Sequence, residues 1–124
     1  MMASASHIAE QQRRFRLQKA WSDLTSTPAG RFSMGVSPTE ARTFHFILAK
    51  LKKGRSAAQF QIQDLSRARN MSDATIRRHL ALLESAGLIS FTSPGKGRPS
   101  AGAGSPLWNV WVNTSWKRKV RDHG

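Results

Sequence analysis

The stretch that decides the fold spans residues 60–89 and reads FQIQDLSRARNMSDATIRRHLALLESAGLI. It predicts a short helix over residues 61–69 and a longer helix that ends at Gly87. Between the helices, Asn70 tolerates the left-handed conformation of a tight turn, and Ser72 can cap the longer helix. Gly87 suits the left-handed position that follows a helix. Two helices joined by so short a turn predict a helix-turn-helix.

The residues on either side extend this unit. Upstream, the run SPTE at residues 37–40 is a capping box with proline at the first helical position, and it predicts a helix that ends at Lys52, Lys53 and Gly54. Phe60 stands alone as a strand of one or two residues. Downstream, residues 88–91 and 107–113 predict two strands of a hairpin. The fold class is therefore α+β, mainly helical: a winged helix-turn-helix.

The chain divides into three parts on this interpretation. Residues 1–36 form an N-terminal basic helix, over about residues 7–24, and then a linker or extended arm over residues 25–36. Residues 37–113 form the winged helix-turn-helix domain. Residues 114–124 form a basic C-terminal tail.

Charge indicates the partner. Twenty Lys and Arg against seven Asp and Glu give a net charge of +13 over 124 residues. Such an excess attracts polyanions, of which nucleic acid is the commonest, and no segment has the wide apolar face of a membrane-surface helix. No cysteine and no long apolar run are present. We therefore expect a cytoplasmic or nucleoid protein without a membrane partner.

The helix-turn-helix stretch resembles bacterial winged-helix transcription regulators. Those families share a leucine in the second helix (here Leu65) and a Ser-x-x-Thr start to the third helix (here Ser72 to Thr75). They also share a Leu-Glu-x-x-Gly-Leu-Ile exit, here residues 83–89. The resemblance covers about residues 37–113 and singles out no subfamily, since plasmid and phage replication proteins contain similar domains. It implies DNA binding in transcription, replication or segregation.

The third helix of the winged helix-turn-helix domain, which starts at Ser72 and runs to Ala86, is expected to carry the DNA contacts. Its apolar residues would bury one face, and the opposite face would expose Arg77 and Arg78 between small alanines. Arginine can bind guanine O6 and N7 in the major groove or a backbone phosphate. Ser72 and Thr75 suit a phosphate at the helix start, and Asp73 suits either a cytosine amino group or the helix N-terminus itself. A merely solvated basic face is the alternative.

The hairpin tip is the second expected contact. Lys96 and Arg98 lie among glycines, serines and prolines, and the run Lys96-Gly97-Arg98-Pro99 is similar to the Arg-Gly-Arg-Pro core of AT-hook peptides, with lysine in place of the first arginine. An arginine held extended by the following proline suits a narrow A·T minor groove. The alternative is a hairpin tip with incidental charges.

The ends of the chain leave further alternatives. Six basic side chains there could contact the DNA backbone: Arg13, Arg14, Arg16, Lys117, Arg118 and Lys119. Trp21 and Trp111 could pack together over the back of the domain. The N-terminal helix and the Trp111 region could instead form a homodimer seam.

Catalysis and cofactors are not expected. No glycine-rich run has nucleotide-loop spacing, no histidine pair has metal-ligand spacing with a carboxylate, and no nucleophile has a base beside it. We predict no enzyme activity, no metal and no cofactor. The rival hypothesis is a winged-helix protein–protein interaction module in a nucleoprotein assembly. RNA binding is a third option, although A-form major grooves exclude such a helix.

Overall fold

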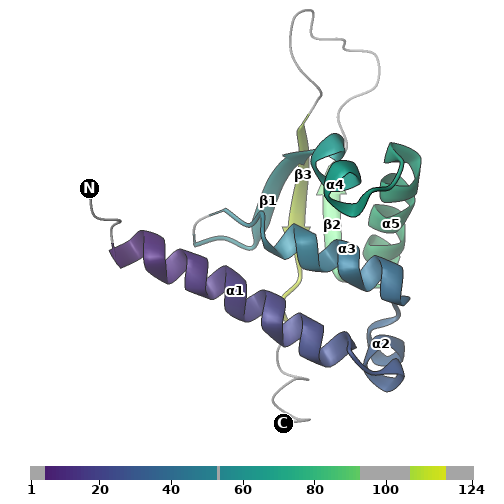
Figure 1. Ribbon diagram of the computed structural model, residues 1–124, viewed down its shortest axis with the longest axis horizontal. Coiled ribbons are helices and arrows are strands. Elements are labelled where there is room, and N and C mark those ends of the chain that lie inside the picture. The colour runs from purple at the N-terminus through teal and green to yellow at the C-terminus, as the bar shows by residue number, and fades with distance from the viewer. Residues whose placement is uncertain (1–4, 53, 93–106, 117–124) are drawn as a thin grey trace, which may run out of the picture.

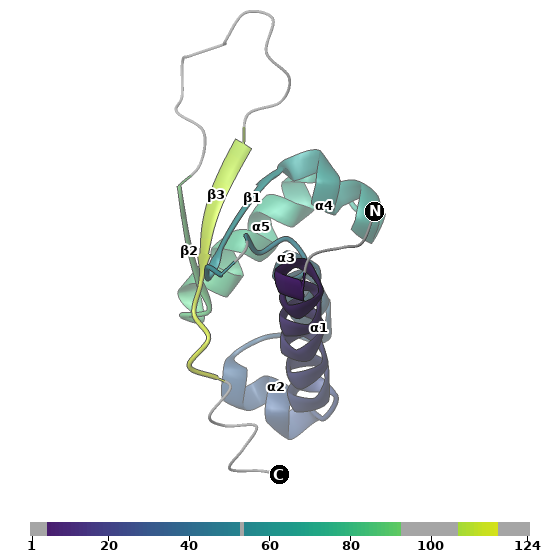
Figure 2. The same cartoon turned by 90° about the vertical axis from the view of Figure 1, so that its left-hand side faces the viewer.

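The computed structural model describes residues 5–52, 54–92 and 107–116 (Figure 1). Five helices and three strands follow in the order α1 (Ala5–Thr25), α2 (Pro28–Met34), α3 (Pro38–Leu48), β1 (Ala57–Gln61), α4 (Ile62–Arg69), α5 (Asp73–Ser85), β2 (Ile89–Thr92) and β3 (Leu107–Val112). The helices lie on one side of the sheet, as the side view in Figure 2 shows. The predicted α+β, mainly helical winged helix-turn-helix is confirmed.

The turn between α4 and α5 forms as the sequence predicts. Asn70 has a φ of 54°, in the left-handed region, and its N–H donates to the carbonyl of Arg67. Ser72 is the N-cap of α5, and its hydroxyl accepts from the N–H of Thr75 at 3.2 Å. These two local features fix the angle at which α5 leaves the turn.

The sheet is antiparallel, with strand order β1-β3-β2. The expectation of a one- or two-residue strand at Phe60 is wrong, because β1 has five residues and pairs along its whole length with β3. Phe60 lies opposite Trp108, and Gln61 lies opposite Leu107. The partner strand lies about fifty residues away in sequence, so local patterning could not reveal the pairing.

The predicted linker or extended arm over residues 25–36 is also wrong in part. Residues Pro28–Met34 form the helix α2. The Thr27 hydroxyl accepts from the N–H of Gly30, proline occupies the first helical position, and Gly35 ends the helix with a φ of 72°. The glycine and proline that suggested a linker therefore delimit a short helix.

The helix α3 starts at its predicted cap and ends earlier than predicted. Ser37 is the N-cap, but the helix ends at Leu48, not at Lys52 to Gly54. Leu51 is buried beyond the helix and forms an isolated bridge with Ala58. Pairing with β1 therefore takes these residues out of the helix.

The core joins α1 to the helix-turn-helix. Trp21 has no exposed surface, and its ring lies 4.4 Å from Phe44 and 5.3 Å from Trp116, measured between centroids. Trp111 by contrast is 49% exposed on β3. The alternative in which Trp21 packs against Trp111 over the back of the domain is therefore wrong. Trp116, expected in a basic tail, is part of the core.

Gly87 gives a first prediction. Its φ is 78°, and no heavy atom lies within 4 Å of the place a Cβ would occupy, so backbone conformation alone should decide the cost of a substitution. We expect Gly87→Val to lower the free energy of unfolding by at least about 1 kcal/mol. Gly87→Asn should cost less, because asparagine tolerates this conformation. Urea unfolding of the three proteins provides the measurement, and equal midpoints would contradict the prediction.

Candidate nucleic-acid interface

The recognition surface is the outer side of α5. Ile76, Leu80 and Leu83 have no exposed surface and hold the inner side of the helix against α3 and α4. On the outer side, Arg77 and Arg78 are exposed, as are the small residues Ala74 and Ala81. Neither arginine forms an ion pair with another residue of the described ranges. Two free guanidinium groups therefore face solvent on a rigidly packed helix.

The side chains at the start of α5 form more hydrogen bonds with one another than the sequence indicates. The Ser72 hydroxyl lies 2.9 Å from the Thr75 hydroxyl and also caps the helix. Asp73, expected to be solvent-exposed, is half-buried. Ser72 is exposed, and Thr75 is half-buried beside it. The cap thus orients the first turn of α5, while the Ser72 hydroxyl stays accessible at its end.

A buried polar contact fixes α5 to α3. The Nδ1 atom of His79, on the inner side of α5, lies 2.8 Å from the Thr43 hydroxyl of α3. Arg69, at the end of α4, donates from Nε to the same hydroxyl at 3.2 Å and from Nη2 to the carbonyl of Thr39 at 3.1 Å. Thr43 and Arg69 could not be identified from the sequence, because nothing in residue spacing marks a contact between three helices. The cluster of Thr43, Arg69 and His79 therefore connects α3, α4 and α5.

The burial of His79 predicts that the fold is less stable in acid. Burial of the ring lowers the pKa of His79 below its ordinary value of 6.5; Glu40 opposes this shift, and Arg69 and Arg78 add to it. The unfolded chain therefore binds the proton more readily, so the stabilisation is complete above pH 6.5 and is lost as pH falls through the folded pKa.

We expect the melting temperature to fall between about pH 8 and about pH 5, and to fall less in His79→Asn. Asparagine can keep a polar atom near the Nδ1 position facing Thr43. Thermal unfolding across this range is the measurement. An identical fall in both proteins would show that His79 is not the responsible group.

Strand β3, which follows the predicted hairpin tip, begins at the end of the sheet next to α4. Leu107 of β3 lies opposite Gln61, which immediately precedes α4, so β3 begins on the side where the helix-turn-helix begins (Figure 1). Lys96 and Arg98, expected to contact DNA, fall outside the described residues. The same holds for Lys117, Arg118 and Lys119.

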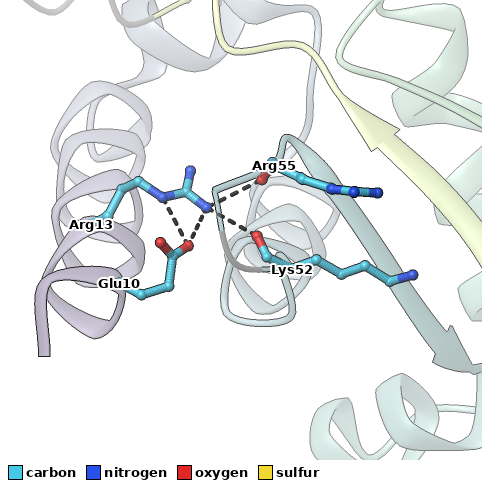
Figure 3. A network of polar contacts seen from close by, with 4 residues as sticks. All are labelled: Glu10, Arg13, Lys52 and Arg55. Atoms are coloured by element: carbon cyan, nitrogen blue, oxygen red, sulfur yellow. Dashed lines mark hydrogen bonds and ion pairs between the residues drawn. The ribbon is translucent and has the colours of Figure 1, made fainter. Parts of the chain in front are cut away.

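The arginines of α1 do not lie beside Arg77 and Arg78 of α5. Arg13 forms an ion pair with Glu10 and donates from Nη2 to the carbonyls of Lys52 and Arg55, each at 3.2 Å (Figure 3). It thereby holds the loop after α3. The i, i+3 spacing of Glu10 and Arg13 could have suggested their ion pair, but not the contact with this loop. The pKa of Glu10 is lowered, chiefly by the hydrogen bond from Arg13.

The other two arginines of this group differ in exposure. Arg14 is half-buried, whereas Arg16 is exposed. Trp21, near the C-terminal end of α1, packs against Trp116, which follows β3, and α1 lies mainly against α2 and α3. The structure therefore does not bring the arginines of α1 onto the surface that presents Arg77 and Arg78.

Helices α3, α4 and α5 with the β1-β3-β2 sheet define a winged helix-turn-helix protein. Residues 47–90, about a third of the chain, match the family model described as "Bacterial regulatory protein, arsR family". The matched segment contains α4, α5 and the start of β2, and it supports a DNA-binding domain of the kind used in transcription regulation. No curated protein and no solved structure gives a match.

The described ranges contain neither a membrane-spanning helix nor a metal-binding cluster. No helix there is both long and apolar enough to cross a membrane. No group of three His, Asp or Glu side chains in the same ranges could hold a metal ion.

Proposed function

We propose that this protein binds duplex DNA with a sequence preference, as a small transcription regulator or as a plasmid- or phage-type replication or segregation factor. The observation that carries the proposal is the two exposed arginines on the outer side of α5, Arg77 and Arg78, neither of which forms an ion pair within the described residues. The alanines beside them allow a groove wall to approach closely. A helix of this kind fits the major groove, where arginine reads guanine.

The rival hypothesis, a protein–protein interaction module, is less well supported. A protein partner would favour an apolar outer side on α5. Leu82, one turn after Arg78, is 44% exposed there, but Ala74 and Ala81 on the same side are small and the two arginines are cationic. The net charge of +13 also favours a polyanion.

The proposal extends to two flanking elements. We assign the wing residues Lys96 and Arg98 to a narrow minor groove or to the backbone beside it.

We also propose that the protein forms a homodimer through α1 and the Trp111 region. The support is apolar surface left uncovered: Ile8 and Phe15, one heptad apart on α1, are 46% and 65% exposed, and Trp111 is 49% exposed. A symmetric dimer would read a palindromic site.

Salt dependence tests whether phosphates are bound. Each phosphate neutralised by Lys or Arg contributes about −0.9 to the slope of log affinity against log salt, so we expect roughly −4 to −8 overall. Fluorescence anisotropy of a labelled duplex at several salt concentrations gives the slope. A slope near zero would reject DNA binding through this basic surface.

A further inference from the structure

A pocket lies where α1, α2 and α3 meet, among helices that flank or begin the helix-turn-helix. Its volume is about 210 Å³. Residues of α1, α2 and α3 line it, and the polar ones are Ser22, Thr25, Arg31, Arg42 and His45. We call it the α1–α3 pocket. None of its lining residues is acidic.

Two arginines from different helices give the pocket its charge. Arg31 of α2 is half-buried and is held by a hydrogen bond from Nη1 to the carbonyl of Thr25 at 2.9 Å. Arg42 of α3 is exposed, and its guanidinium lies over the Phe46 ring, 5.8 Å from the centroid. Neither is paired with a carboxylate within the described part of the chain. Two uncompensated cations at one concave surface favour an anion.

Polar side chains of α1 complete the lining. The Ser22 hydroxyl lies 3.1 Å from His45 Nδ1, and Gln18 donates to the carbonyl of His45 at 3.2 Å. These contacts fix the imidazole between α1 and α3. Gln18 Nε2 also lies 3.5 Å from His45 Nε2, so both nitrogens of the imidazole are engaged. The Ser22 hydroxyl can donate to an anion when His45 Nδ1 carries the proton between them, and Arg31 and Arg42 supply the charged donors.

We propose that the α1–α3 pocket binds a small anion that carries a phosphoryl or carboxylate group. Guanidinium groups bind both groups through paired, charge-assisted hydrogen bonds. The pocket is smaller than the sites that enclose drug-sized ligands, so it suits inorganic phosphate or one end of a small organic acid. The pocket lies on the side of α3 that faces α1 and α2, whereas Thr43 of the same helix contacts His79 of α5. Arg42 lies between these two sides, since its guanidinium and that of Arg69 from α4 both lie over the Phe46 ring.

Phosphate binding to the full chain tests the proposal without DNA. Inorganic phosphate is titrated at constant ionic strength, with chloride as the replaced anion, while NMR follows the four histidine rings. We expect a saturable shift of the His45 resonances and none at His79. Acetate titrated in the same way should shift His45 at higher concentration. Failure of phosphate to give a saturable His45 shift would overturn the proposal.

Two matched variants locate the site. Arg42→Gln should weaken phosphate binding at least about tenfold, because it removes a charge-assisted pair. Arg16→Gln removes an exposed arginine of α1 that does not line the pocket, and it should leave the affinity unchanged. Arg42 is exposed, and unchanged His79 resonances would confirm that the variant folds. Equal weakening in both variants would show a general charge effect and overturn the assignment.

A phosphate of the DNA backbone is the other anion that could bind in the α1–α3 pocket. A short duplex added to the phosphate-free protein should shift resonances of Arg77 and Arg78 and leave His45 unchanged. If the duplex moves His45 and inorganic phosphate does not, the pocket belongs to the DNA interface and the small-anion proposal is wrong. If the duplex binds nowhere, the proposed function fails while the phosphate result still stands.

Discussion

Replacing Trp21 with alanine is expected to lower the free energy of unfolding by about 3–5 kcal/mol. Trp21 has no exposed surface, and its ring packs against Phe44 and Trp116. Its Nε1 also donates to the carbonyl of Ala41 at 2.7 Å. The substitution would leave a cavity between α1, α3 and the end of β3, and it would remove the buried donor to that carbonyl.

Urea unfolding followed by circular dichroism measures this effect. Trp111→Ala is the matched control, because Trp111 is 49% exposed and its truncation should cost much less. A loss for Trp21→Ala no larger than that of the control would mean that α1 does not share the core with α3.

Replacing both Arg77 and Arg78 with alanine is expected to have the largest effect on DNA binding. A lost bidentate guanine contact costs about 1–3 kcal/mol, so the double variant should lose about 2–6 kcal/mol on its preferred duplex if both side chains read bases. The loss on a scrambled duplex should be smaller, because only non-specific attraction is reduced there. Titration of both duplexes at one salt concentration measures the difference.

A double variant of equal charge change serves as the control. Arg16 and Lys19 are exposed on α1, away from the outer side of α5, so Arg16→Ala with Lys19→Ala should weaken both duplexes slightly and alike. Equal losses on the two duplexes for the Arg77 and Arg78 variant would reduce these arginines to phosphate contacts. No loss at all would reject α5 as the recognition helix.

The parts of the fold that depend on neighbouring residues could be predicted from the sequence. The cap at Ser72, the left-handed turn at Asn70 and the left-handed Gly87 all follow from conformational preferences of single residues. The burial of Ile76, Leu80 and Leu83 follows from helical periodicity. The exposure of Arg77 and Arg78 then follows as its geometrical consequence.

The errors lie where tertiary contacts decide. Only pairing with β3 extends the strand around Phe60, and only the bridge to Ala58 takes Leu51 out of α3. The error over α2 is local instead, because Thr27 next to Pro28 supplies an N-cap that makes residues 28–34 a helix and not a linker. The contact between His79 and Thr43 joins residues 36 apart in sequence, and the residues lining the α1–α3 pocket come from three helices. No local pattern marks either arrangement.

The central claim is that this protein recognises a DNA sequence through α5. The most direct measurement is selection of bound fragments from a pool of random duplex DNA, carried out in parallel with the wild type and with the Arg77→Ala, Arg78→Ala variant. The account predicts an enriched motif for the wild type, palindromic if the protein is a dimer, and loss of that enrichment in the variant. A wild-type pool that is retained by the protein but has the same sequence composition as the input would contradict the account.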